Sequence, residues 1–143
     1  MAGKRLALIV INSTYKDLAI VTGQNPIIKS AIELAKVLED PAIGSYEVTA
    51  LLDESSTKIN EQINILFNNR DQDDLLLLYF SGIGMVDENN EGYIATINSR
   101  PNQLSTTAIS ISNIRTAMEK SLSEQQVLIM DVSYAGFLKE GER

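Results

Sequence analysis

The chain has 143 residues, of which 44% are hydrophobic and 22% are charged, so it can bury a core and fold as one globular domain over residues 1–143. Its 19 acidic and 12 basic residues give a formal charge of -7, and this acidic balance without a basic run argues against a nucleic-acid or anionic membrane surface. Cysteine and histidine are absent, which excludes disulfides, thiolate or imidazole metal sites, and any mechanism with a thiol nucleophile or an imidazole base.

Strand and helix patterns alternate along the chain. The expected elements are, in order, a strand at 5–12, a loop at 13–25, a helix at 26–40, a strand at 46–52, a helix at 56–67, a strand at 75–80, a hairpin at 85–95, a polar loop at 101–107, a helix starting at Ser110 or Ser112, and a buried strand at 126–130 that stops at Asp131. This alternation predicts a three-layer α/β domain with a mainly parallel sheet flanked by helices.

Helix boundaries and inward faces follow from the same patterns. Pro26 suits a first helical turn, and Ser55 or Ser56 can cap the second helix. The apolar positions expected to face the sheet are Ile59, Ile63, Leu66 and Phe67 in the second helix and Ile114, Ala117, Met118 and Leu122 in the third. Residues 135–143 are expected to form a tail or the start of a linker.

The apolar run at residues 75–80, Leu-Leu-Leu-Leu-Tyr-Phe, is typical of a central strand buried on both faces. Ligands of open α/β sheets bind beyond the carboxyl ends of such strands, where this run and the later strand are followed by residues 81–84 and 131–136. Glycines after a strand are commonly turn residues and nothing more. The two ends together nevertheless predict a cleft at Ser81, Gly82, Gly84, Tyr134 and Gly136.

The two strand ends resemble those of the caspase-like peptidases, particularly the metacaspases and their bacterial relatives. Residues 79–84 are Tyr-Phe-Ser-Gly-Ile-Gly, where the family has Tyr-Phe-Ser-Gly-His-Gly with the catalytic histidine. Residues 131–136 are Asp-Val-Ser-Tyr-Ala-Gly, where the family has the nucleophilic cysteine in the third position. The similarity extends to residues 8–15 and 34–38, and it implies the caspase-like fold for nearly the whole chain.

The catalytic positions are where this chain departs from the family. Ile83 stands at the histidine position and Ser133 at the cysteine position, and the sequence has no histidine elsewhere. An isoleucine transfers no proton, and a serine hydroxyl needs a neighbouring base before it can attack a carbonyl. A serine–lysine arrangement remains as an alternative, with Lys139 as the nearest lysine in sequence.

The resemblance also implies a pocket for a basic substrate residue. One of the two family acids in that pocket aligns with Ser30, and the second aligns with Asp131. Asp131 can equally be a cap at the end of its strand. With one of the two acids replaced, the residues alone do not predict recognition of a basic residue.

We expect a catalytically inactive caspase-like domain that acts through association with another protein. The resemblance covers only the large-subunit half, so the expected partners are a small-subunit half, an active caspase-like paralogue or a second copy. The first alternative is an altered form of an active cysteine endopeptidase that cleaves after basic residues, with changes at 83 and 133. The second is a small-molecule-binding α/β domain whose resemblance to caspases is accidental.

No cofactor or metal is expected. Residues 81–84 lack the lysine and spacing of a phosphate-binding loop, and no Gly-x-Gly-x-x-Gly follows the first strand. The acidic turn at Asp71, Asp73 and Asp74 is expected to be solvated, with an ion site as the alternative. The sequence has no apolar run of membrane-spanning length and no small-residue cleavage site near its start, so we expect a cytoplasmic protein.

Overall fold

The computed structural model describes residues 3–16 and 25–133, which form a mixed sheet with helices on both faces. In chain order the elements are β1 Arg5–Ile11, α1 Asn25–Glu39, β2 Glu47–Leu52, α2 Ser56–Phe67, β3 Leu75–Val86, β4 Gly92–Ile94, α3 Leu104–Thr107, β5 Ile109–Ser110, α4 Ile111–Lys120 and β6 Gln125–Ser133. Strands and helices alternate along the chain, as the hydrophobic periodicity of the sequence predicts.

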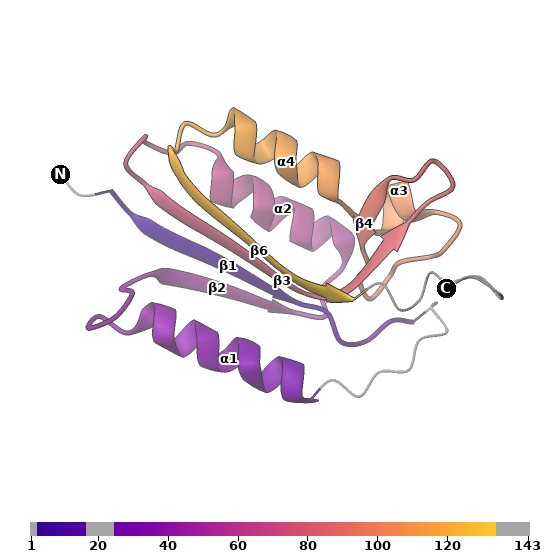
Figure 1. The fold of residues 1–143 in the computed structure, drawn as a ribbon, viewed down its shortest axis with the longest axis horizontal. Helices are drawn as coiled ribbons and strands as arrows, with labels where there is room; N and C mark the ends of the chain where they lie inside the picture. The colour runs from indigo at the N-terminus through magenta and orange to yellow at the C-terminus, as the bar shows by residue number, and fades with distance from the viewer. Residues whose placement is uncertain (1–2, 17–24, 134–143) are drawn as a thin grey trace.

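Four parallel strands, in the order β2, β1, β3 and β6, make the main part of the sheet. Helix α1 covers one face, and α2 and α4 cover the other (Figure 1). This confirms the expected three-layer α/β architecture. None of the helices described here is long and apolar enough to cross a membrane.

Strand β3 is central, as the apolar run predicts, but it is longer than expected. The predicted end at residue 80 is wrong, because the strand continues to Val86. Residues up to Ile83 pair with β6, and from Gly84 onward the strand pairs antiparallel with β4 in a hairpin. The chain therefore changes sheet partner at Gly82 to Gly84 without leaving extended conformation, which places the candidate site inside a strand.

Strand β6 runs from Gln125 to Ser133, so the expected strand at 126–130 is too short, and it is not fully buried. Alternate residues face solvent, with Val127 43% and Ile129 39% exposed. The reason is position in the sheet, since β6 pairs only with β3 among the described strands. A short apolar run cannot distinguish a central strand from one at the edge.

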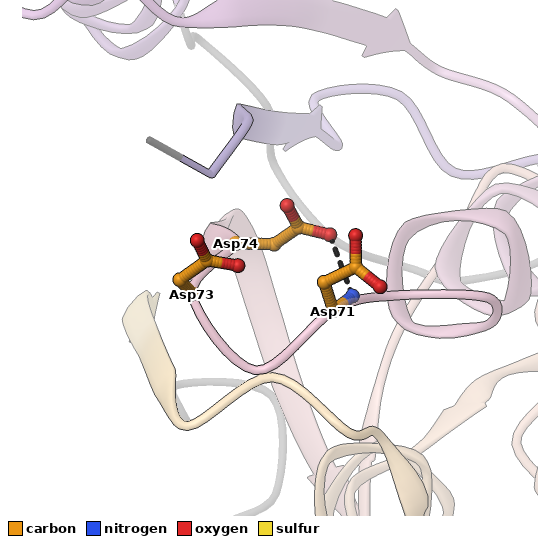
Figure 2. Close-up of side chains that lie close together, drawn as sticks. All are labelled: Asp71, Asp73 and Asp74. Carbon is orange, nitrogen blue, oxygen red and sulfur yellow. Dashed lines mark hydrogen bonds between the residues drawn. The ribbon is translucent and has the colours of Figure 1, made fainter. Parts of the chain in front are cut away.

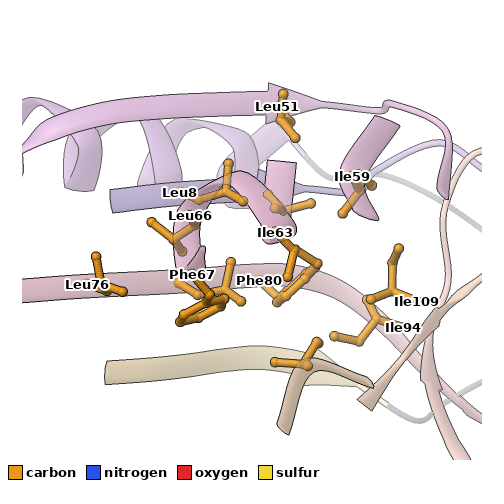
Figure 3. Packing of buried hydrophobic residues seen from close by; sticks show 13 residues of the cluster. Leu8, Leu51, Ile59, Ile63, Leu66, Phe67, Leu76, Phe80, Ile94 and Ile109 are labelled. Atoms are coloured by element: carbon orange, nitrogen blue, oxygen red, sulfur yellow. The ribbon is translucent and has the colours of Figure 1, made fainter. Parts of the chain in front are cut away.

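Helix α2 supplies most of the core on its face of the sheet. Ser55 caps it by accepting a hydrogen bond from the Lys58 backbone N–H at 3.2 Å, as the sequence predicts. Its four predicted inward residues are all buried, and they pack against β1 and β3 (Figure 3). The buried members of this cluster are Leu8, Val10, Leu51, Ile59, Ile63, Leu66, Phe67, Leu76, Leu78, Phe80, Ile94, Ile109 and Ile114.

Helix α4 begins after Ser110, whose hydroxyl accepts a hydrogen bond from the Asn113 N–H at 3.2 Å. The prediction that Leu122 faces inward is wrong, because α4 ends at Lys120 and the Leu122 side chain is 72% exposed. The chain turns there because the Ser123 hydroxyl donates to the Asp74 carbonyl at 2.7 Å.

The segment after β4 is more ordered than the polar loop expected at 101–107, since Leu104–Thr107 forms the short helix α3. Buried hydroxyls hold this segment together. The Ser99 hydroxyl donates to the Thr107 carbonyl at 2.6 Å, and Asn98 Oδ1 accepts from the Ser56 N–H at 2.9 Å. The loop is thereby fixed to the first turn of α2.

Candidate functional site

The structure brings together the two residues that the sequence comparison aligns with the family's catalytic positions. Ile83 near the end of the β3–β6 pairing lies directly opposite Ser133, the last residue of β6. Paired strands lie about 4.8 Å apart, so the two side chains start from neighbouring backbone positions. The sequence comparison of the two strand ends thus corresponds to a real spatial pair.

Ile83 belongs to a small apolar cluster on the α3 side of the β3–β4 hairpin. Its half-buried side chain packs against the buried residues Tyr15, Met85, Tyr93, Ala95, Leu104 and Ala108. Its carbonyl oxygen accepts a hydrogen bond from the Ala95 N–H at 2.8 Å, which fixes the backbone at this point. The residue that the sequence comparison aligns with the family's histidine is here part of the hydrophobic packing.

Gly82, next to Ile83, has a backbone conformation that side chains rarely adopt. Its φ is +153°, and a Cβ atom there would lie 3.0 Å from Asn12 Cβ and 3.1 Å from Tyr15 Oη. Both the torsion and the close approach of the first loop therefore require glycine.

Replacing Gly82 by alanine is expected to lower the free energy of unfolding by about 1–3 kcal/mol, because the new methyl group meets strained backbone and two close neighbours. Urea unfolding followed by circular dichroism measures the loss. Gly92→Ala is the control, since a Cβ there meets only the Ile111 side chain. Equal losses for both variants would contradict the argument from φ.

The loop after β1 closes over this end of the sheet through Asp53. The Asp53 carboxylate accepts hydrogen bonds from the Ser13 N–H and hydroxyl, both at 2.7 Å, and from the Thr14 N–H at 3.0 Å. Tyr15 then donates its hydroxyl to the Asn12 carbonyl at 2.9 Å. Burial raises the pKa of Tyr15, and the negative charge of Asp53 raises it further, so the phenol stays protonated.

Two buried polar atoms lie where the pairing of β1 with β3 ends. Asn12 Oδ1 and Ser81 Oγ have no hydrogen-bond partner in the described part of the chain, although both residues are almost fully buried. The Asn12 Nδ2 group donates to the Ser81 carbonyl at 3.4 Å, and the Asn12 backbone N–H donates to the same oxygen at 2.9 Å. Ser81 is therefore an interior residue here.

Asp131 lies on the exposed face of β6, opposite Ser81 of β3. The Tyr79 hydroxyl donates to Asp131 Oδ2 at 3.3 Å. Partial burial raises the pKa of Tyr79, and the negative charge of Asp131 raises it further. Ser30 is exposed on α1, and within the described ranges no hydrogen bond joins it to Asp131.

Tyr134, Gly136 and Lys139 lie outside the described residues. The expectations that Tyr134 and Gly136 line the cleft, and the serine–lysine alternative, therefore stay predictions. Sequence reasoning did not single out Asn12, Tyr15 and Asp53 for the site. The only signal they carried was their place just after two predicted strands.

The acidic turn before β3 brings three carboxylates within 4.8 Å of one another, at Asp71, Asp73 and Asp74 (Figure 2). Asp74 already uses both oxygens, since Oδ1 accepts from the Lys4 N–H at 2.9 Å and Oδ2 from the Asp71 N–H at 2.8 Å. These bonds fasten the start of β1 to the start of β3. These hydrogen bonds give Asp74 a structural role in the turn.

Asp74 is expected to make stability depend on pH. The pKa of its carboxyl lies below the ordinary value of 3.8. The largest cause is the hydrogen bond from the Asp71 N–H, and the next is the hydrogen bond from the Lys4 N–H. The lowered folded-state pKa stabilises the domain above pH 3.8, and this stabilisation is lost as the pH falls through the folded-state value. Asp74→Asn should lower stability at neutral pH and flatten the acid limb of a stability–pH curve, whereas Asp73→Asn should leave that limb unchanged.

The fold and these contacts define an α/β domain whose candidate site lies where the parallel pairing of β3 with β6 ends, at Ile83 and Ser133. A family model described as the caspase domain matches residues 4–142. Because the match covers nearly the whole chain, the chain belongs to the caspase-domain family. No match is found among curated proteins.

Proposed function

We propose that this chain is a catalytically inactive domain of the caspase family, closest in type to the metacaspases, that acts by binding another polypeptide. One observation supports the loss of activity above all. The residue opposite Ser133 is Ile83, whose side chain packs into an apolar cluster, and the sequence contains no histidine or cysteine.

Among the described residues, Ser133 has no evident activating base. Asp131 lies two residues earlier, on the same face of β6, because side chains alternate along a strand. A carboxylate is a much weaker base than an imidazole, and this one already accepts the Tyr79 hydroxyl. A serine hydroxyl so placed is a poor nucleophile toward a peptide carbonyl.

The binding role is supported by the outer edge of β6. This strand is nine residues long and pairs on one side only among the described strands. Val127 and Ile129 also leave apolar surface open beside the edge. Edge strands of this kind pair readily with another strand, so a small-subunit half, a paralogue or a second copy are the partners we propose.

Peptide hydrolysis tests the proposal. The unmodified chain should cleave no peptide containing arginine or lysine, with or without Ca²⁺, at enzyme concentrations where an active family member gives a clear signal. Cleavage that disappears in the Ser133→Ala variant would overturn it, because that result would make Ser133 a working nucleophile. Cleavage that survives Ser133→Ala would point to a contaminating peptidase.

A further inference from the structure

Helices α2 and α4 lie side by side on one face of the sheet (Figure 1), and an open groove of about 470 Å³ runs between them. This volume is in the range of ligand pockets, about 300–1,000 Å³. The residues that line the groove are Asn60, Ile63, Asn64, Asn68, Asn113, Ile114, Thr116, Ala117 and Lys120. None of them belongs to β6 or to the candidate site, so the groove is a separate surface of the domain.

Asparagine side chains dominate the walls of this groove. Four of the nine lining residues are asparagines, and all four are exposed, while the buried Ile63 and Ile114 contribute an apolar floor. In the part of the chain that the structure describes, none of the four asparagine side chains makes a hydrogen bond. Each side-chain amide can donate two hydrogen bonds and accept others. Water satisfies such groups when nothing is bound, so the kind of ligand follows from their spacing and not from their number.

The asparagines of α2 recur at a regular interval. Asn60 and Asn64 lie four residues apart on the helix, and Asn68, its C-cap residue, follows after four more. Four residues of an α-helix rise about 6 Å, and alternate residues of an extended polypeptide are about 6.6 Å apart. The asparagines therefore match every second peptide group of an extended segment that runs along the groove. Because an amide side chain can accept from an N–H and donate to a carbonyl oxygen, it suits the main chain of any sequence.

Charge favours an acidic segment over a basic one. Lys120 is the only charged residue among the described lining residues, in a chain whose formal charge is -7. Helices α2 and α4 each lead back to the start of a parallel strand, so they run in the same direction and Lys120 lies at the Asn68 end of the groove. A single-stranded nucleic acid would need several cations and stacking aromatic side chains, which the described lining does not contain.

We propose that this groove binds an extended polypeptide segment through main-chain hydrogen bonds to Asn60 and Asn64, with an acidic side chain of the segment beside Lys120. Residues of the segment that point to the floor are small and apolar, since Ile63 and Ile114 lie there. The inference goes beyond the proposed function, because it neither depends on the loss of catalysis nor uses the β6 edge.

Selection from a random nine-residue peptide library displayed on phage tests the proposal, and fluorescence polarisation measures the affinity of the selected peptides. These peptides should contain aspartate or glutamate. The double variant Asn60→Ala with Asn64→Ala should bind them about tenfold more weakly, because it loses two side-chain amides. Alanine favours a helix more than asparagine does, so the loss would not come from melting of α2. Glu61→Ala, an exposed residue of α2 outside the groove, is the control and should bind as the unmodified chain does.

N-methylation of a selected peptide, one residue at a time, tests the main-chain contacts. Each methyl group removes one N–H donor, so the loss of affinity should recur at every second residue. Lys120→Glu should weaken the binding of acidic peptides about fivefold. Arg115→Glu makes the same change of charge on α4 and should leave binding unchanged, since Arg115 is exposed and does not line this groove.

The inference would be overturned if no peptide were enriched, or if the asparagine double variant bound the selected peptides as well as the unmodified chain does. It would also be overturned if N-methylation showed no period of two, or if Lys120→Glu and Arg115→Glu had equal effects. A single-stranded thymidine oligonucleotide that bound in place of the peptides, and was released by Lys120→Glu, would have the same consequence.

The proposed function stands or falls on other results. Peptides whose binding is lost in Ile129→Lys, but not in the asparagine double variant, would support association at the β6 edge and exclude the groove. Peptide hydrolysis by the unmodified chain would overturn the proposed function and leave the binding measurements on the groove unaffected.

Discussion

Replacing Phe80 by alanine is expected to lower the free energy of unfolding by about 3–5 kcal/mol. Phe80 lies in the central strand β3 and is completely buried among the side chains of α2 and β4 (Figure 3). Truncation removes a large apolar side chain and leaves a cavity that a close-packed interior fills only in part. Urea unfolding at neutral pH, followed by circular dichroism, measures the change.

A loss of this size is a large fraction of the total stability of a small domain, and it can leave the alanine variant too unstable to measure well on its own. Phe80→Leu is therefore measured beside it, and we expect it to lower the free energy of unfolding by about 1–2 kcal/mol. Val86→Ala is the control within the same strand, because Val86 is 36% exposed and should cost about 0.5 kcal/mol. If Phe80→Ala and Val86→Ala were equally damaging, the burial of β3 would not explain the loss.

The central strand could be predicted because its residues carry the signal themselves. Four leucines followed by Tyr79 and Phe80 leave no polar face, and only a strand covered on both sides accommodates such a run. Its end could not be predicted in the same way. The strand continues through Gly82 because β4 returns to pair with it, and that pairing depends on a hairpin that closes ten residues later.

The position of β6, at the edge among the described strands, shows the limit of reasoning from local composition. Its apolar residues resemble those of β3, yet Val127 and Ile129 are partly open to solvent. Strand order is a property of the whole topology, and two strands with similar sequences can occupy the centre and the edge of one sheet. The prediction of a buried strand therefore needed information that residues 126–130 do not contain.

The candidate site, too, could be predicted only in part. The approach of Ile83 to Ser133 could be predicted, because two parallel strands that share an edge bring their carboxyl ends together. The roles of Tyr15 and Asp53 could not, since they depend on how the loop after β1 folds back over Gly82. Loop geometry of this kind is set by individual hydrogen bonds, which leave no periodic pattern in the sequence.

Substituting Ile83→His together with Ser133→Cys is expected to give the chain an activated thiol but not, by itself, peptidase activity. The two backbone positions are paired neighbours, so an imidazole on β3 can reach a thiol on β6 and lower its pKa. In a chain without other cysteines, iodoacetamide should therefore alkylate the double variant roughly fivefold faster at neutral pH than the Ser133→Cys single variant.

Hydrolysis of arginine or lysine peptides by the double variant should appear only when a small-subunit half is supplied, because a thiolate without the rest of the cleft does not orient a substrate. The single variants Ile83→His and Ser133→Cys should stay inactive under all conditions, since each lacks one of the two reacting groups. Equal alkylation rates for the single and double variants would mean that the two side chains do not meet. Faster alkylation without hydrolysis, even with the added half, would mean that the cleft has lost more than these two residues.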